Sequence, residues 1–235
     1  MTQRATDASA PAAPRPIVRD DVAYVLPMAI FMAFTWVGGQ WPSLYPASYA
    51  AKVILVAIAL AVLWRHFTKI SWRYWWLGAI VGVIGIFQWV PMQLWLQRNV
   101  EFFAPSGEPF DPTKVFAESG AMLYAFLAFR IIGAVLVVPV MEELFWRDFL
   151  WRQILAPNDF KLAEVGERSW SALLIVSGVF AFVHGNWWLT SIVWALMIGG
   201  LLMYTKSLGA CIIAHAVTNL LLAAYVLKYR DWAFW

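Results

Sequence analysis

Charged side chains are scarce in this chain. Lys, Arg, Asp and Glu together make up 13% of its 235 residues, whereas hydrophobic residues make up 62%. A soluble globular domain usually has about 25% charged residues, which cover its surface. The composition therefore excludes an ordinary water-soluble domain.

Cysteine and histidine are also rare. Cys211 is the single cysteine, which excludes an intramolecular disulfide and argues against a thiolate metal cluster. The formal net charge is only +3, and the basic residues of such an apolar chain indicate membrane topology. We therefore expect no nucleic-acid partner.

Long apolar runs dominate the chain instead. Runs of about 18 or more apolar residues predict membrane-spanning helices, and runs without polar alternation disfavour a β-barrel. We predict an all-α polytopic transmembrane helical bundle of about seven to eight spans in a lipid bilayer, with any functional site buried between helices. The 16 tryptophans fit anchoring at the membrane interfaces. The apolar segments lie near residues 22–41, 48–64, 72–96, 115–151, 170–189, 190–206 and 208–228.

The chain divides into three regions. Residues 1–21 are rich in Ala and Pro and lack the features of a cleaved signal peptide, so we expect a disordered cytoplasmic tail. Residues 22–114 should form transmembrane helices without a functional motif, and residues 115–235 a transmembrane core that carries the candidate functional residues. Glycines at positions 78, 82 and 85 predict close helix packing.

The connectors between apolar segments predict the orientation. Segments 65–73 and 152–169 are basic and Lys206 separates the last two spans, whereas segment 97–119 is net acidic. The positive-inside rule then places the N-terminus and the basic connectors in the cytoplasm. Seven crossings would leave the C-terminus on the other side.

Two adjacent carboxylates, Glu142 and Glu143, interrupt the long apolar segment 115–151. If Arg130 lies at the outer interface and Arg152 at the inner one, both glutamates lie inside the membrane. A charge at that depth costs at least a few kcal/mol, so the pair indicates a functional site.

Three other residues in apolar runs have simpler interpretations. Arg130 and Lys52 have long side chains that can extend to the interface, so we expect them to snorkel rather than to bind a substrate. Pro139 should kink its helix just before the two glutamates.

Three pairs of residues four positions apart stand out, and each pair projects from one helix face. These pairs are Glu143 with Arg147, Phe180 with His184, and His215 with Asn219. Glu142 points about 100° away from Glu143, so Glu143 is better placed to pair with Arg147. Glu142 is then left for proton transfer.

These residue types can hydrolyse an amide without a serine or cysteine nucleophile. A Glu and a His can position and deprotonate a water molecule between them. A second His and an Asn carboxamide can donate hydrogen bonds to the oxyanion that forms when this water attacks a carbonyl.

The patterns Glu142-Glu143-x-x-x-Arg147, Phe180-x-x-x-His184 and His215-x-x-x-Asn219 follow one another on successive spans. Over about residues 120–228, the chain resembles the type II CAAX prenyl endopeptidase and bacteriocin-processing family of intramembrane proteases. The resemblance implies that Glu142 and His184 activate water and that His215 and Asn219 hold the oxyanion, with Glu143, Arg147 and Phe180 in support.

The resemblance also implies the setting of the enzyme. It implies a multi-pass protein of a bacterial-type inner (plasma) membrane that acts on peptide or protein substrates within the membrane. Lipidated, leader and sorting-tail peptides are the expected substrates, and no cofactor is expected.

Three other functions remain open at this stage. The first is a zinc-dependent protease with Glu142, Glu143, His184 and His215 as ligands, although the chain has no His-Glu-x-x-His helix. The second is a non-catalytic scaffold or immunity protein, which would not need an intact set of catalytic residues. The third is a transporter or proton-coupled channel, which the absence of visible repeats disfavours.

Overall fold

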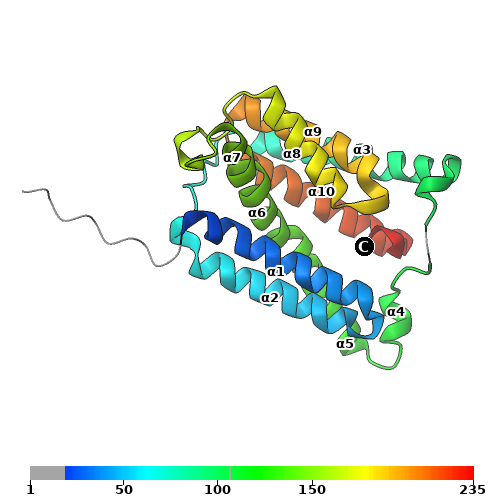
Figure 1. Ribbon diagram of the computed structural model, residues 1–235. Helices are drawn as coiled ribbons and strands as arrows, with labels where there is room; N and C mark the ends of the chain where they lie inside the picture. Colours follow the sequence, from blue (N-terminus) through cyan, green and yellow to red (C-terminus); the bar gives the residue numbers. More distant parts are fainter. Residues whose placement is uncertain (1–18, 106) are drawn as a thin grey trace, which may run out of the picture.

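The computed structural model describes residues 19–105 and 107–235, and all regular elements in these ranges are helical. Figure 1 shows the helices packed side by side in one bundle, which confirms the all-α prediction. The α-helices are α1 (Asp20–Gln40), α2 (Tyr45–Val62), α3 (Trp75–Asn99), α4 (Pro112–Val115), α5 (Gly120–Ile132), α6 (Val138–Glu143), α7 (Trp151–Leu155), α8 (Trp170–Phe182), α9 (Trp188–Thr205) and α10 (Leu208–Tyr229).

The N-terminal boundary of the bundle differs slightly from the expected one. Helix α1 begins at Asp20, so the last two residues of the expected 1–21 tail belong to this helix. Asp20 and Asp21 lie in its first turn, where carboxylates interact favourably with the helix dipole. Residues 1–18 of the expected tail lie outside the described residues.

Six helical segments are long and apolar enough to cross a membrane, which supports a multi-pass membrane protein. The predicted segment 170–189 is shorter in the structure, because α8 has 13 residues and ends at Phe182. Gly185 follows with a φ of 55°, a left-handed conformation that glycine adopts easily. Helix α8 is therefore about 20 Å long, shorter than the roughly 30 Å of a bilayer core.

The longest helical segment, Gly120–Leu155, is interrupted twice by π-helical backbone. Two π-helical stretches, η4 (Gly133–Val137) and η5 (Leu144–Leu150), flank the short helix α6. In Figure 1 this segment runs obliquely through the bundle from α5 at one end to α7 at the other. Because π-helical turns are rare and occur mostly at functional sites, α6 with its two glutamates is a notable position.

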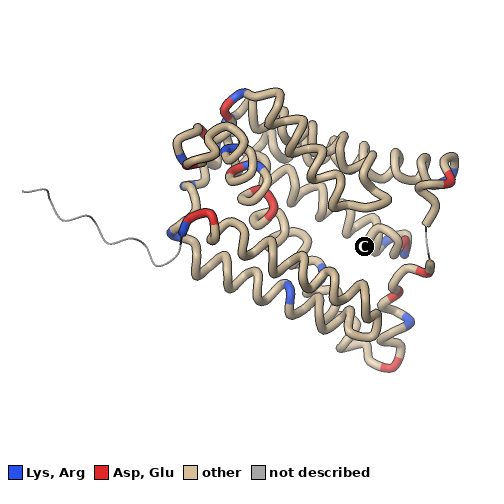
Figure 2. The backbone as a smooth tube through the Cα atoms, in the orientation of Figure 1, with Lys and Arg blue, Asp and Glu red and all other residues tan. Residues whose placement is uncertain are grey.

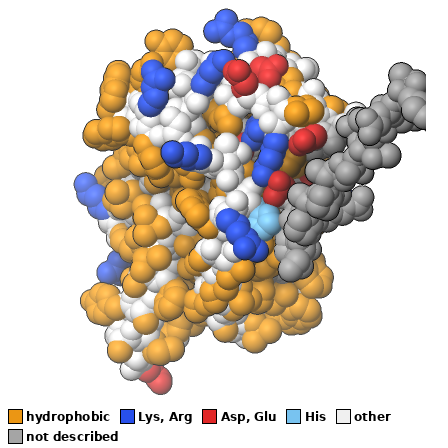
Figure 3. All heavy atoms as spheres, turned by 90° about the vertical axis from the view of Figure 1, so that its left-hand side faces the viewer, with side chains coloured by type: hydrophobic (Ala, Val, Ile, Leu, Met, Phe, Trp, Pro, Cys, Tyr) orange, Lys and Arg blue, Asp and Glu red, His pale blue; other side chains and the backbone are white. Residues whose placement is uncertain are grey.

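The three basic connectors meet at one end of the bundle, as the sequence predicts. Lys161 Nζ donates a hydrogen bond of 3.0 Å to the carbonyl of His66, and Ser207 Oγ donates one of 2.7 Å to the carbonyl of Ser71. Figure 2 shows the charged residues concentrated at the two ends of the bundle. Figure 3 looks onto the connector end, where basic and acidic side chains are spread over the face and hydrophobic side chains surround them.

Close packing of α3 on α10 fixes the helix that carries His215 and Asn219. A Cβ atom on Gly82 would lie 2.6 Å from the carbonyl oxygen of Ala214, and one on Gly85 would lie 2.6 Å from Oγ1 of Thr218. Thr218 Oγ1 also lies 3.0 Å from the carbonyl of Gly82 and donates to it. The predicted packing role of these glycines is confirmed.

Replacement of Gly82 should weaken this contact. We expect Gly82→Ala to destabilise the protein by about 1–3 kcal/mol, because the new methyl group overpacks the interface. The midpoint of thermal unfolding in detergent micelles should fall by several degrees. Gly200→Ala is the control, since a Cβ there meets no atom within 4 Å. Equal midpoints for the two variants would contradict the packing argument.

Candidate active site

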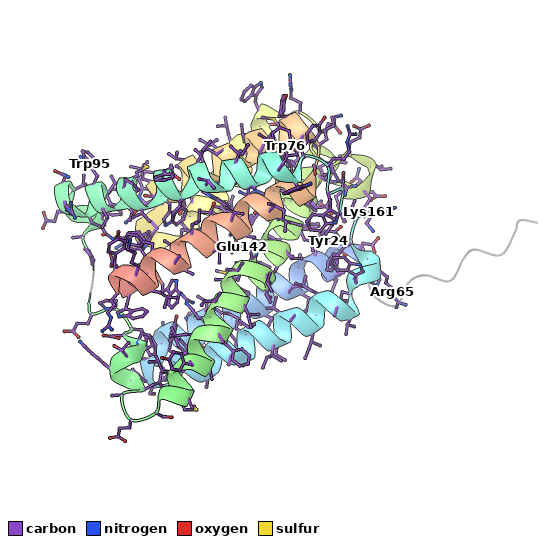
Figure 4. The ribbon with its side chains drawn as sticks, turned by 180° about the vertical axis from the view of Figure 1, so that it is seen from behind. Tyr24, Arg65, Trp76, Trp95, Glu142 and Lys161 are labelled. Carbon is purple, nitrogen blue, oxygen red and sulfur yellow. The ribbon has the colours of Figure 1, made fainter. Side chains whose placement is uncertain are left out.

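A cavity of about 150 Å³ lies between α3, α6, α8, α9 and α10 and is hereafter called the central cavity. Glu142, His184, His215 and Asn219 all line it, together with Trp89, Val138, Phe180, Trp194, Thr218 and Leu222. Figure 4 shows Glu142 well inside the bundle, between Trp95 at one end and Lys161 at the other. The structure thus brings together the four residues that the sequence singles out as catalytic.

The short helix α8 places His184 at the depth of Glu142. Helices α7 and α8 are consecutive and meet at the connector end of the bundle, where residues 156–169 join them. Glu142 precedes the end of α7 by 13 residues, and His184 follows the start of α8 by 14 residues. At 1.5 Å per residue, both lie about 20 Å from this end. A longer α8 would carry the histidine past the carboxylate.

The two glutamates have different surroundings. Glu143 is fully buried, and its Oε1 accepts hydrogen bonds from Arg147 Nη1 at 3.2 Å and from His215 Nδ1 at 2.8 Å. Glu142 is 8% exposed, and no residue in the described part of the chain donates a hydrogen bond to its carboxylate. The pairing of Glu143 with Arg147 is as predicted, whereas the contact with His215 is an additional finding.

Aromatic rings hold Arg147 and both histidines. The guanidinium carbon of Arg147 lies 4.9 Å from the ring centre of Phe180 and 5.4 Å from that of Trp194, within the range of cation–π attraction. The ring of Phe180 also lies 4.3 Å from that of His184, and the ring of Trp194 lies 4.7 Å from that of His215. Phe180 therefore links Arg147 to His184, which gives its place in the sequence pattern a physical basis.

A backbone contact determines the tautomer of neutral His184. Its Nδ1 lies 2.7 Å from the carbonyl oxygen of Phe180, and a carbonyl only accepts hydrogen bonds. Nδ1 therefore carries the proton, and Nε2 carries a lone pair when the ring is neutral. No described residue bonds to Nε2, so this atom is left to accept a hydrogen bond from a molecule in the central cavity.

The Asn219 side chain supplies a hydrogen bond that the backbone of the π-helical stretch η4 lacks. The N–H of Val138 bonds to the carbonyl of Gly133, and Pro139 has no N–H, so neither supplies the carbonyl of Ala134. Asn219 Nδ2 donates a hydrogen bond of 2.8 Å to that oxygen. Because Pro139 has no N–H, the carbonyl of Ala134 is free to accept this hydrogen bond, which positions the Asn219 side chain. The second N–H of the carboxamide remains for a ligand.

Trp194 is a site residue that the sequence did not indicate. It is 2% exposed, lines the central cavity and contacts both Phe180 and His215. Interfacial anchoring, expected for the tryptophans in general, does not describe this residue. Its position within an apolar span rather than at its end was the only available signal.

The described residues contain no group of three or more His, Cys, Asp or Glu side chains arranged to hold a metal ion. Of the four ligands in the zinc alternative, Glu143 is engaged by Arg147 and His215, and His184 Nδ1 by a backbone carbonyl. The arrangement therefore does not fit a ready-made zinc site.

Comparison with protein families agrees with the motif resemblance. Residues 124–221 match the family model described as type II CAAX prenyl endopeptidase Rce1-like. Over these residues the chain is similar to this family of membrane proteases. The Rce1-like region runs from α5 to α10 and contains every residue of the three sequence patterns. Searches of curated proteins and of solved structures gave no match.

The buried ion pair generates a prediction about stability. Glu143→Ala should destabilise the protein by about 3–5 kcal/mol, because it leaves Arg147 buried without its charge partner. The thermal unfolding midpoint in detergent should fall strongly. Glu164→Ala is the control, since its ion pair with Lys206 is exposed, and its midpoint should be unchanged. A midpoint for Glu143→Ala equal to that of the control would contradict a structural role for the buried pair.

Proposed function

We propose that this protein is an intramembrane endopeptidase that hydrolyses a peptide bond with an activated water molecule. The observation that carries the proposal is the lining of the central cavity by Glu142, His184, His215 and Asn219. Its substrates are lipidated, leader or sorting-tail peptides that reach this cavity within the membrane.

Water activation is assigned to Glu142 and His184. A cavity of about 150 Å³ has room for a few water molecules, each of which occupies about 30 Å³ in the liquid. Nε2 of His184 accepts one O–H of the water and orients it. Glu142 takes the other proton as the water oxygen bonds to the substrate carbonyl carbon.

Oxyanion stabilisation is assigned to His215 and Asn219. In this scheme His215 carries a proton on both ring nitrogens. Its Nδ1–H stays bonded to Glu143, while its Nε2–H and the free N–H of the Asn219 carboxamide donate to the developing negative charge. Glu142 then returns its proton to the amide nitrogen, and the C–N bond breaks.

A covalent intermediate is not part of this scheme. Thr218 is the one hydroxyl residue that lines the central cavity, and its Oγ1 lies 3.0 Å and 2.9 Å from the carbonyls of Gly82 and Ala214. Cys211 is fully buried beside Ile198 and does not line this cavity. Water is therefore the nucleophile.

Removal of the base tests this scheme. Glu142→Gln should reduce peptide cleavage by about 10²–10⁴-fold, the usual contribution of a general base. Cleavage of synthetic peptides by purified protein is followed by mass spectrometry, and the unfolding midpoint shows that the variant folds. Cys211→Ala is the control and should cleave like the wild type. Wild-type rates for Glu142→Gln would overturn the assignment.

The orientation of the bundle is also a proposal. The three basic connectors lie at one end, and the positive-inside rule places this end in the cytoplasm together with the N-terminus. Segment 97–119 and the C-terminus then face the opposite side.

Labelling of single cysteines tests this orientation. In a Cys211→Ala background, Glu108→Cys should react with a membrane-impermeant maleimide on intact cells. Glu164→Cys should react only after permeabilisation, because it lies in the connector end. Both positions are exposed in the folded protein, so poor access does not explain a difference. The reverse labelling pattern would show that the proposed orientation is wrong.

A further inference from the structure

A second cavity, of about 180 Å³, adjoins the central cavity and is hereafter called the basic cavity. The two cavities share Val138, Asn219 and Leu222 as lining residues. Asn219 therefore borders both spaces, and a peptide that lies across its carboxamide would enter both. The basic cavity takes its name from two cationic lining residues, Lys52 and Arg130.

Lys52 does not reach the membrane interface, and its predicted snorkelling is wrong. The residue is 6% exposed, and its Nζ donates a hydrogen bond of 3.1 Å to Thr35 Oγ1. The same nitrogen lies 4.4 Å from the ring centre of Phe31 and 4.6 Å from that of Tyr49. The packing of α2 against α1 and α5 encloses the side chain, so the ammonium group stays within the bundle.

Arg130 lies on α5, another of the helices that border this space. Its guanidinium carbon is 4.5 Å from the ring centre of Tyr49 and 5.4 Å from that of Trp235. Its Nε is buried and donates to no residue in the ranges 19–105 and 107–235. Two cations thus contact the same tyrosine ring from different helices.

Neither cation has a carboxylate partner. No ion pair within 4.0 Å involves Lys52 or Arg130 among the described residues, whereas the buried Arg147 and Arg152 each pair with an acidic residue. Buried charges are usually paired, because desolvation without a counter-charge is costly. Lys52 is buried, Arg130 is half-buried with its Nε enclosed, and neither has a counter-charge, so the basic cavity is suited to bind an anion.

We propose that Lys52 and Arg130 form a subsite that binds a carboxylate of the peptide held in the central cavity. This inference rests on the proposed endopeptidase function. A planar carboxylate matches the donor geometry of a guanidinium, and an ammonium adds a point charge. The shared residue Asn219 makes the subsite continuous with the reacting groups. The carboxylate is that of the peptide C-terminus or of an acidic side chain beyond the scissile bond.

A lipid phosphate fits the position less well. Lys52 follows the start of α2 by seven residues, which corresponds to about 10 Å along the helix. That depth is below the headgroup region at this end of the bundle, whereas a peptide in the central cavity already lies at that depth.

Matched peptide pools test the subsite. Pools that differ only in a free C-terminal carboxylate or a C-terminal carboxamide, each with and without one acidic side chain, are incubated with purified full-length protein. Mass spectrometry gives kcat/KM for each cleaved peptide. We expect wild-type protein to prefer peptides with a carboxylate about tenfold, as for a charge-assisted hydrogen bond. Whether the preference follows the free C-terminal carboxylate or the acidic side chain identifies which carboxylate binds.

Substitutions then connect the preference to Lys52. Lys52→Met should abolish the preference, so that this variant cleaves carboxylate peptides no faster than uncharged ones. Lys52→Arg should retain the preference, and Lys69→Met, at an exposed position in a connector, should match wild type. Equal cleavage of charged and uncharged peptides by wild-type protein would refute the subsite and leave the endopeptidase function standing.

A binding measurement distinguishes failure of the endopeptidase function from failure of the subsite. The Glu142→Gln variant is titrated with the carboxylate and carboxamide pools, and the two dissociation constants are compared. Tighter binding of the carboxylate pool without any cleavage by wild-type protein would refute the endopeptidase function and support the subsite. Equal binding that Lys52→Met does not change would refute the subsite whatever the cleavage result.

Discussion

One fully buried carboxylate connects the parts of the candidate site. Glu143 accepts hydrogen bonds from Arg147 on its own helical segment and from His215 on α10. Without this bridge, the first and third sequence patterns would lie on neighbouring helices with no direct polar link. Because ionic groups without water depend strongly on their partners, the relative position of these helices is tightly constrained. The adjacent Glu142 can then present its carboxylate to the central cavity.

Irregular backbone is a second common theme of the site. The glutamates lie between two π-helical stretches, Pro139 cannot donate a hydrogen bond to the first of them, and α8 ends before it would cross the bilayer core. Backbone of this kind is tolerated within a membrane only where protein or a cavity satisfies its polar groups. Here Asn219 bonds the carbonyl of Ala134, so a residue of the site also stabilises the backbone beside it.

Much of this arrangement could be predicted from the residues. Spacing alone gave the pair of Glu143 and Arg147, the glycines of α3 predicted close packing, and the basic connectors predicted which ends meet. The resemblance to a protease family added the residues that line the central cavity, and the family comparison agrees over residues 124–221.

Other features could not be predicted, for physical reasons. A constant period of 3.6 residues per turn contains no π-helical stretches, so it could not show that Glu143 faces His215. The apolar segment predicted from hydropathy extends past Gly185, so hydropathy does not reveal that α8 ends three residues before this glycine. The burial of Lys52 depends on how α1, α2 and α5 pack together, which the sequence of a single helix does not determine.

The outer face of α8 has a consequence for the surrounding lipid. Leu174, Val179 and Phe182 on this helix are exposed apolar side chains, but the helix is some 10 Å shorter than a typical hydrocarbon core. Acyl chains beside such a short helix compress, and the headgroups are drawn inward. We therefore expect local thinning of the bilayer beside α8, which would shorten the route for polar molecules between the aqueous phase and the interior of the bundle.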